Sequence, residues 1–141
     1  MNLNGYYLFI NGTLRAIGSA SDKIQISGGD ITFGSSDQTG SISRFENAAI
    51  NSTISTNKPL TVNNNIIDGG VSVTSSTISN NIISGGGPFT DWGGRPQDAT
   101  FAVTTYGDSS VSSNAISSST GGFGILIRTG HTSVSGNVIS N

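Results

Sequence analysis

The chain of 141 residues has no cysteine and only one histidine. The absence of cysteine excludes disulfide bonds and thiolate metal sites, and the single histidine, His131, excludes a zinc site built from several histidines. Charge is also scarce, because 10% of the residues are charged and eight acidic residues outnumber six basic ones. Since the basic residues are spread along the chain, no nucleic-acid surface is expected. No cofactor and no metal site is predicted.

Long apolar runs and helical patterns are missing as well. The longest apolar runs, residues 6–10 and 123–127, have the length of a β-strand, whereas a membrane-spanning helix needs about 18 residues. No stretch repeats apolar residues at helical spacing over several turns. The start has no basic segment followed by an apolar one, so we expect a removed signal peptide or, preferably, a segment of a longer protein. An all-β chain without membrane insertion is predicted.

One short phrase occurs four times in the sequence. An apolar residue is followed three positions later by Asn and by two further apolar residues. The copies run from Val62 to Ile67, from Ile78 to Ile83, from Val111 to Ile116 and from Val134 to Ile139. Because the phrase is strand-like and lies among Gly, Ser, Thr and Asn, each copy is expected to form one coil of a β-solenoid. The predicted fold is one domain, residues 1–141, forming a parallel β-helix of about six coils.

The Asn of each phrase is predicted to be structural. A buried amide needs partners for its donors and its acceptor, and an Asn one coil away supplies them. We therefore expect an internal ladder formed by Asn65, Asn81, Asn114 and Asn137. Asn also tolerates the left-handed backbone conformation, which we expect these residues to adopt at the corner.

The unequal intervals between these Asn residues predict that every coil has the same strands, whereas the turns between the strands differ in length. The interval from Asn81 to Asn114 fits one coil plus a long loop insertion at about residues 85–100. The strand after the turn aligns Val71-Ser72-Val73 with Phe101-Ala102-Val103 and with Phe123-Gly124-Ile125, with the large apolar residues inward. The outward positions of this alignment, among them Ala102 and Thr104, form no regular Thr array, so ice binding is not expected.

The opening stretch, Tyr6 to Ser19 followed by Lys23 to Ser27, resembles the first coil of right-handed parallel β-helix proteins of the pectate-lyase-like superfamily. Residues Gly40 to Ile50 are similar to their second coil, and the Asn phrases are similar to their later repeats. The resemblance covers nearly the whole chain. It implies a right-handed β-helix like those of bacterial and archaeal extracellular surface proteins. It implies no particular activity, because this superfamily includes lyases, hydrolases, epimerases, adhesins and surface spacers.

Members of that superfamily usually have a capping helix before the first coil and further coils after the last one. This chain starts in a strand and stops inside a repeat phrase, so both ends of the solenoid are expected to be open. The expected end surfaces, Tyr6 to Ile10 and Val134 to Ile139, are unlike each other. Contact between them would be head to tail and would give filaments.

The acidic residues do not form the pattern that an enzyme of this fold requires. A polysaccharide lyase needs several carboxylates around calcium and a basic residue for proton abstraction. A glycoside hydrolase needs at least two carboxylates across the scissile bond. The eight acidic residues of this chain fall mostly singly in turns. The Gly130-His131 pair is followed by Thr132 and lacks the paired Asp residues of polygalacturonases. A non-enzymatic protein is therefore expected.

Two groups of residues are candidates for binding a partner or a carbohydrate. In the insertion these are Phe89, Trp92 and Arg95, because loops on rigid scaffolds often carry binding surfaces. An equal alternative is that Phe89 and Trp92 pack back on the solenoid as a satellite cluster. The second group is Tyr106, Asp108, Arg128 and His131, which the register places together on adjacent coils. An aromatic ring with charged neighbours suits a sugar. The alternative is an exposed, screened ion pair.

These observations favour a non-enzymatic extracellular or cell-surface module with a structural or adhesive role. Its expected partners are further copies of itself, stacked end to end, or a surface glycan. The alternative is a carbohydrate-binding or polysaccharide-cleaving protein with its site near residues 85–100, either a lyase or a glycoside hydrolase.

Overall fold

The computed structural model describes residues 1–34, 41–90, 96–117 and 123–140, with the backbone alone described at 87–90, 96–100 and 123. Within these ranges there are 19 β-strands and no helix. The strands form one seven-stranded sheet and two six-stranded sheets, and almost every pairing is parallel. No helix of the described residues could cross a membrane.

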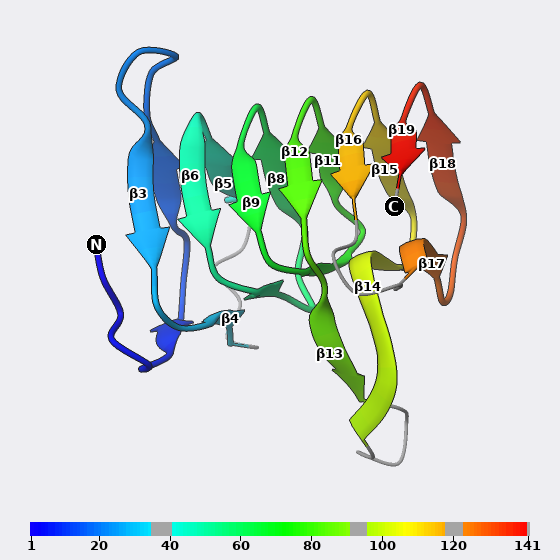
Figure 1. Ribbon diagram of the computed structural model, residues 1–141, viewed down its shortest axis with the longest axis horizontal. Coiled ribbons are helices and arrows are strands. Elements are labelled where there is room, and N and C mark those ends of the chain that lie inside the picture. Colours follow the sequence, from blue (N-terminus) through cyan, green and yellow to red (C-terminus); the bar gives the residue numbers. More distant parts are fainter. Residues whose placement is uncertain (35–40, 91–95, 118–122, 141) are drawn as a thin grey trace.

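Each coil contributes one strand to each of three sheets, and the coils lie side by side along the long axis (Figure 1). The first sheet contains β1 (Leu8–Ile10), β4 (Ile31–Phe33), β7 (Ile54–Ser55), β10 (Val71–Thr74), β14 (Pro96–Tyr106) and β17 (Phe123–Ile127), together with β13 (Gly87–Thr90). The second sheet contains β2 (Arg15–Ile17), β5 (Ser43–Glu46), β8 (Leu60–Asn63), β11 (Thr77–Ser79), β15 (Ser109–Ser112) and β18 (Thr132–Ser135). The third sheet contains β3 (Ile24–Ser27), β6 (Ala48–Asn51), β9 (Ile66–Asp68), β12 (Ile82–Ser84), β16 (Ala115–Ser117) and β19 (Val138–Ser140). The prediction of a parallel β-helix of about six coils is confirmed.

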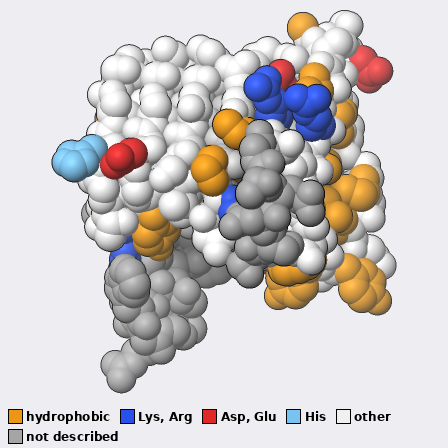
Figure 2. All heavy atoms as spheres, turned by 180° about the vertical axis from the view of Figure 1, so that it is seen from behind, with side chains coloured by type: hydrophobic (Ala, Val, Ile, Leu, Met, Phe, Trp, Pro, Cys, Tyr) orange, Lys and Arg blue, Asp and Glu red, His pale blue; other side chains and the backbone are white. Residues whose placement is uncertain are grey.

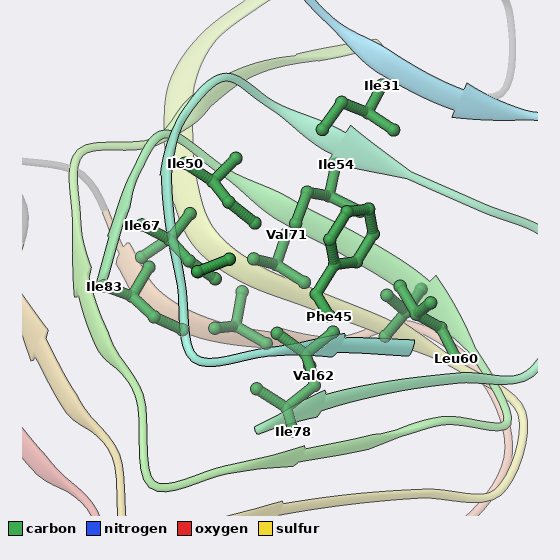
Figure 3. Close-up of a cluster of buried hydrophobic side chains, with 14 of the residues drawn as sticks. Ile31, Phe45, Ile50, Ile54, Leu60, Val62, Ile67, Val71, Ile78 and Ile83 are labelled. Carbon is green, nitrogen blue, oxygen red and sulfur yellow. The ribbon is translucent and has the colours of Figure 1, made fainter. Parts of the chain in front are cut away.

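The core is a thin column of aliphatic side chains that point inward from all three sheets (Figure 3). Ile31, Ile54 and Val71 follow one another in register through the first sheet, and all three are buried. Phe45 is the largest fully buried side chain among the described residues, and its ring meets that of Phe33 edge to face with centroids 6.2 Å apart. Each inner coil therefore buries its own apolar residues against the coils on either side.

The repeat phrase corresponds to a corner followed by a strand of the third sheet. Of the two apolar residues after Asn, the second points into the core and is buried, as Ile67 and Ile83 are. The first, Ile66 or Ile82, points outward and is exposed. This alternation follows from the two-residue period of a β-strand.

The predicted Asn ladder is confirmed at the corner between the second and third sheets. Asn65, Asn81 and Asn114 are buried, and Asn137 in the last coil is half-buried. The side-chain Oδ1 of Asn81 accepts hydrogen bonds from the backbone N–H and the Nδ2 of Asn65, at 2.9 and 3.0 Å. Asn114 bonds Asn81 in the same way, and Asn137 bonds Asn114. Each Nδ2 also donates to a backbone carbonyl of an earlier coil, as from Asn81 to Val62.

The expectation that the ladder residues adopt the left-handed conformation is wrong. The residue immediately before each of them does so: Asn64, Asn80, Ser113 and Gly136 have φ angles of 56°, 57°, 56° and 62°. The sharp bend at this preceding position turns the ladder side chain into the core. The two functions of the corner, bending the backbone and bonding the next coil, are thus divided between two residues.

Buried hydroxyl groups at the opposite end of the second-sheet strands perform a similar role, which the repeat phrase did not predict. Ser43, Ser76 and Ser109 immediately precede or begin their strands and are buried. The Oγ of each accepts a hydrogen bond from a backbone N–H one coil earlier, from Leu14, Leu60 and Ser76 respectively. Ser is too common in this chain for such a column to stand out in the sequence.

The predicted register across the insertion is off by two residues. Val71 pairs with Val103 rather than with Phe101, whereas the pairing of Phe101 with Phe123 is as expected. Ala102 and Thr104, which were assigned to the outer surface, are buried, and Phe101 is only half-buried. A shift of two preserves the inward and outward alternation, so the apolar pattern cannot detect it.

The expected insertion at about residues 85–100 contains β13 and the first part of β14. These segments pair antiparallel, with Gly87 opposite Phe101 and Thr90 opposite Pro96. In Figure 1 they extend away from the body of the solenoid. The antiparallel pairing interrupts the parallel pattern only here among the described strands.

Candidate functional site

The structure brings together part of the predicted group in the turns that follow β14 and β17. The Asp108 Oδ1 accepts a hydrogen bond of 2.9 Å from the His131 backbone N–H, and the His131 Nδ1 lies 3.5 Å from the same oxygen. Arg128 follows β17, where its backbone N–H donates to Thr105, next to Tyr106 on the adjacent coil. The Asp108 and His131 side chains are almost fully exposed, so an ion pair between them is weak.

The hydrogen bond from the His131 backbone N–H lowers the pKa of Asp108 below its ordinary value. Because this pKa is lower in the folded chain than in the unfolded chain, the bond stabilises the fold above the ordinary pKa and is lost as the pH falls through the lowered one. An NMR titration is expected to show the Asp108 carboxyl protonating at a lower pH in the folded chain than in the unfolded chain. If the Asp108 carboxyl protonated at the same pH in the folded and unfolded chains, the bond would not form in solution.

The predicted binding residues of the insertion are less well described. Phe89 lies in β13, where the structure describes the backbone alone, and Trp92 and Arg95 lie outside the described residues. Within the described ranges, no three His, Asp or Glu side chains lie close enough together to hold a metal ion.

The clearest unsatisfied surface is the free face of the last coil, formed by β17, β18 and β19. Val134 and Val111 occupy equivalent inward positions in register, yet Val134 is 45% exposed and Val111 is 0% exposed. Ile139 and Ile116 differ in the same way, at 54% and 1%. Val134 and Ile139 occupy the same inward positions as their buried counterparts, but no described coil covers them.

The Asn ladder is also incomplete on this face. In each earlier step, the backbone N–H of a ladder Asn donates to the Oδ1 of the Asn in the next coil. The Asn137 Nδ2 bonds backward to Val111 and to Ser135, and no described residue accepts a hydrogen bond from its backbone N–H. The free face therefore presents apolar side chains and a backbone N–H donor at the positions where an earlier coil would contact the next coil.

The opposite end of the solenoid differs from the expectation of an open surface. Residues Met1 to Leu3 lie beside β3, with a parallel bridge between Asn2 and Ser27 and a hydrogen bond from the Leu3 N–H to Ser27. The inward residues of the first coil, Ala16 and Ile26, are buried. The expectation of two open ends is thus wrong for the third sheet at this end.

Exposed aromatic side chains are the main apolar feature of the first coil. Tyr6, Tyr7 and Phe9 are largely exposed, whereas Leu8 and Ile10 are half-buried. The predicted end surface from Tyr6 to Ile10 is therefore mixed, with outward aromatic rings and inward aliphatic groups. The two ends of the molecule are unlike, as expected.

Comparisons with protein-family models, with curated proteins and with solved structures find no match to this chain. The parallel β-helix is established by its strand pairing.

Proposed function

We propose that this chain is a non-enzymatic β-helix module with a structural or adhesive role in an extracellular or cell-surface protein, and that it stacks end to end. The observation that carries the proposal is the apolar face of the last described coil, where Val134 and Ile139 are exposed among the described residues. Exposed strand edges and apolar cross-sections favour pairing with a further strand. The resemblance to the pectate-lyase-like superfamily supports the extracellular location.

The proposed occupant of this face is the first coil of a second copy. Its free strand edges, β1 and β2, would continue the first and second sheets at about 4.8 Å. Because the two end surfaces differ, each contact leaves the opposite ends free, and the copies grow into a filament. Few charges lie at the junction, so salt has little effect on the expected assembly.

Replacing Ile139 with Lys is expected to abolish end-to-end association, because it places a charge in the apolar cross-section of the junction. The matched control is Val138→Lys, since Val138 is exposed on the outer side of the same strand. Light scattering over a range of concentrations measures both variants beside the unmodified chain. Growth of particle mass with concentration is expected for the unmodified chain and for Val138→Lys. A strict monomer at high concentration in the unmodified chain would contradict the proposal.

A carbohydrate-binding role remains the second candidate. It is supported by the hairpin of β13 and β14, which extends from the solenoid at the place where the sequence carries Phe89, Trp92 and Arg95. A screen of immobilised glycans tests it directly, and binding to none of them would argue against it.

A further inference from the structure

Two arginines lie side by side on the outer surface of the second sheet. Arg15 on β2 is the register partner of Arg44 on β5, so the two residues are neighbours on adjacent parallel strands, about 4.8 Å apart along the solenoid. Like charges directly opposite each other destabilise a sheet unless a counter-charge lies between them. Figure 2 shows basic side chains gathered beside an acidic one on this side of the molecule.

The available carboxylate satisfies only part of this charge. The Glu46 Oε1 lies 3.4 Å from the Arg44 Nη1, two residues along the same strand. The register partner of Glu46 on β2 is Ile17, so no acidic residue occupies the equivalent position beside Arg15. Arg15 is exposed and has no hydrogen-bond or ion-pair partner among the described residues. The pair of arginines therefore carries excess positive charge.

A second observation indicates a missing acceptor. The Arg44 Nε is buried, and no described residue accepts a hydrogen bond from it. The two arginines line a hollow of about 200 Å³ together with Ser41 and Ile42. Guanidinium groups bind oxyanions through paired N–H donors, and an oxyanion in this hollow would lie beside both arginines and offset their excess charge.

The arginine column continues along the sheet as a column of hydroxyl groups. The register partners after Arg44 are Thr61, Thr77, Ser110 and Ser133, and a parallel outward column contains Asn63, Ser79, Ser112 and Ser135. These side chains match the hydrogen-bonding groups of sugars, but they include no further cation. A polymer with a charge on every unit, such as a nucleic acid, would find only one charged anchor on this surface.

We propose that Arg15 and Arg44 bind one carboxylate or sulfate group of a mostly neutral polysaccharide, whose sugar units lie along the hydroxyl columns of the second sheet. This inference rests on the adhesive part of the proposed function and names its ligand chemistry. It is independent of the end-to-end stacking.

The test is a calorimetric titration in the Ile139→Lys background, which separates binding from stacking. The probes are lightly carboxymethylated dextran, unmodified dextran, sodium sulfate and a single-stranded oligonucleotide, all at one ionic strength. The variants are Arg15→Gln and Arg44→Gln, and the matched control is Lys23→Gln, which removes the same charge next to the third sheet. Arg15→Gln keeps the Arg44–Glu46 pair intact and so guards against a loss of folding.

Carboxymethylated dextran is expected to bind, with a dissociation constant at least tenfold higher in each Arg variant and unchanged in Lys23→Gln. Unmodified dextran is expected to bind at least tenfold more weakly than the carboxymethylated form. If Arg15→Gln and Lys23→Gln weakened binding of the carboxymethylated dextran equally, the effect would depend on net charge alone. That result would overturn the site. Binding of inorganic sulfate as tight as that of the carboxymethylated dextran, tighter binding of the oligonucleotide, or no binding at all would overturn the polysaccharide assignment.

Discussion

Replacing Asn81 with Leu is expected to lower the free energy of unfolding by about 2–4 kcal/mol. Asn81 lies in the middle of the ladder and is 1% exposed. Its loss removes the acceptor of the buried Asn65 backbone N–H and the side-chain donor to the Val62 carbonyl. Each buried polar group without a partner costs about 1–3 kcal/mol, and the added apolar surface of Leu offsets only part of this.

Equilibrium denaturation in urea measures this effect, and Asn57→Leu is the matched control. Asn57 is exposed in the turn between β7 and β8, so the same chemical change there is expected to leave the free energy of unfolding almost unchanged. If both variants unfolded at the same urea concentration as the original chain, the ladder would not contribute to stability.

Replacing Phe45 with Ala is expected to lower the free energy of unfolding by about 3–5 kcal/mol. Phe45 is 0% exposed and packs edge to face against Phe33. A solenoid coil holds few core side chains, so neighbouring residues cannot fill a cavity of this size without moving the strands. The exposed Phe9 provides the control, because Phe9→Ala removes the same ring from the surface.

Hydrogen exchange would show where the Phe45→Ala variant loses protection. Each coil of a solenoid contacts only its neighbours, so stability is distributed along the axis as a sum of local terms. The amides of β5 and of the adjacent β2 and β8 are expected to exchange faster than those of β15 and β18. Uniform acceleration in all coils would instead show that the domain opens as one cooperative unit.

The repeat phrase predicted the ladder because the chemistry of a buried amide leaves few alternatives. An Asn at a fixed place in each copy, followed by strand residues, has no equally good partner except its counterpart one coil away. The serine column remained hidden because Ser43, Ser76 and Ser109 share their position with Leu14 and Leu60 in other coils. A hydroxyl there is useful but not required, so no periodic signal appears.

Other features depend on turn lengths, which the sequence does not reveal. Arg15 and Arg44 become neighbours because the chain between them completes one full coil. No local sequence pattern shows how many residues that coil contains. The error of two residues between β10 and β14 has the same origin, since the insertion separates the strands and their alternation fits either pairing. Functional residues in the insertion could be proposed but not positioned for the same reason.

The sequence by itself determined the parallel β-helix, its coil number and the four ladder positions, because these follow from local composition and from the need of each buried amide for a partner. Only the tertiary structure decided the register across the insertion, the cover that Met1 to Leu3 give the third sheet, and the pairing of Arg15 with Arg44. These are contacts between segments distant in sequence, and their geometry depends on how each variable turn closes its coil.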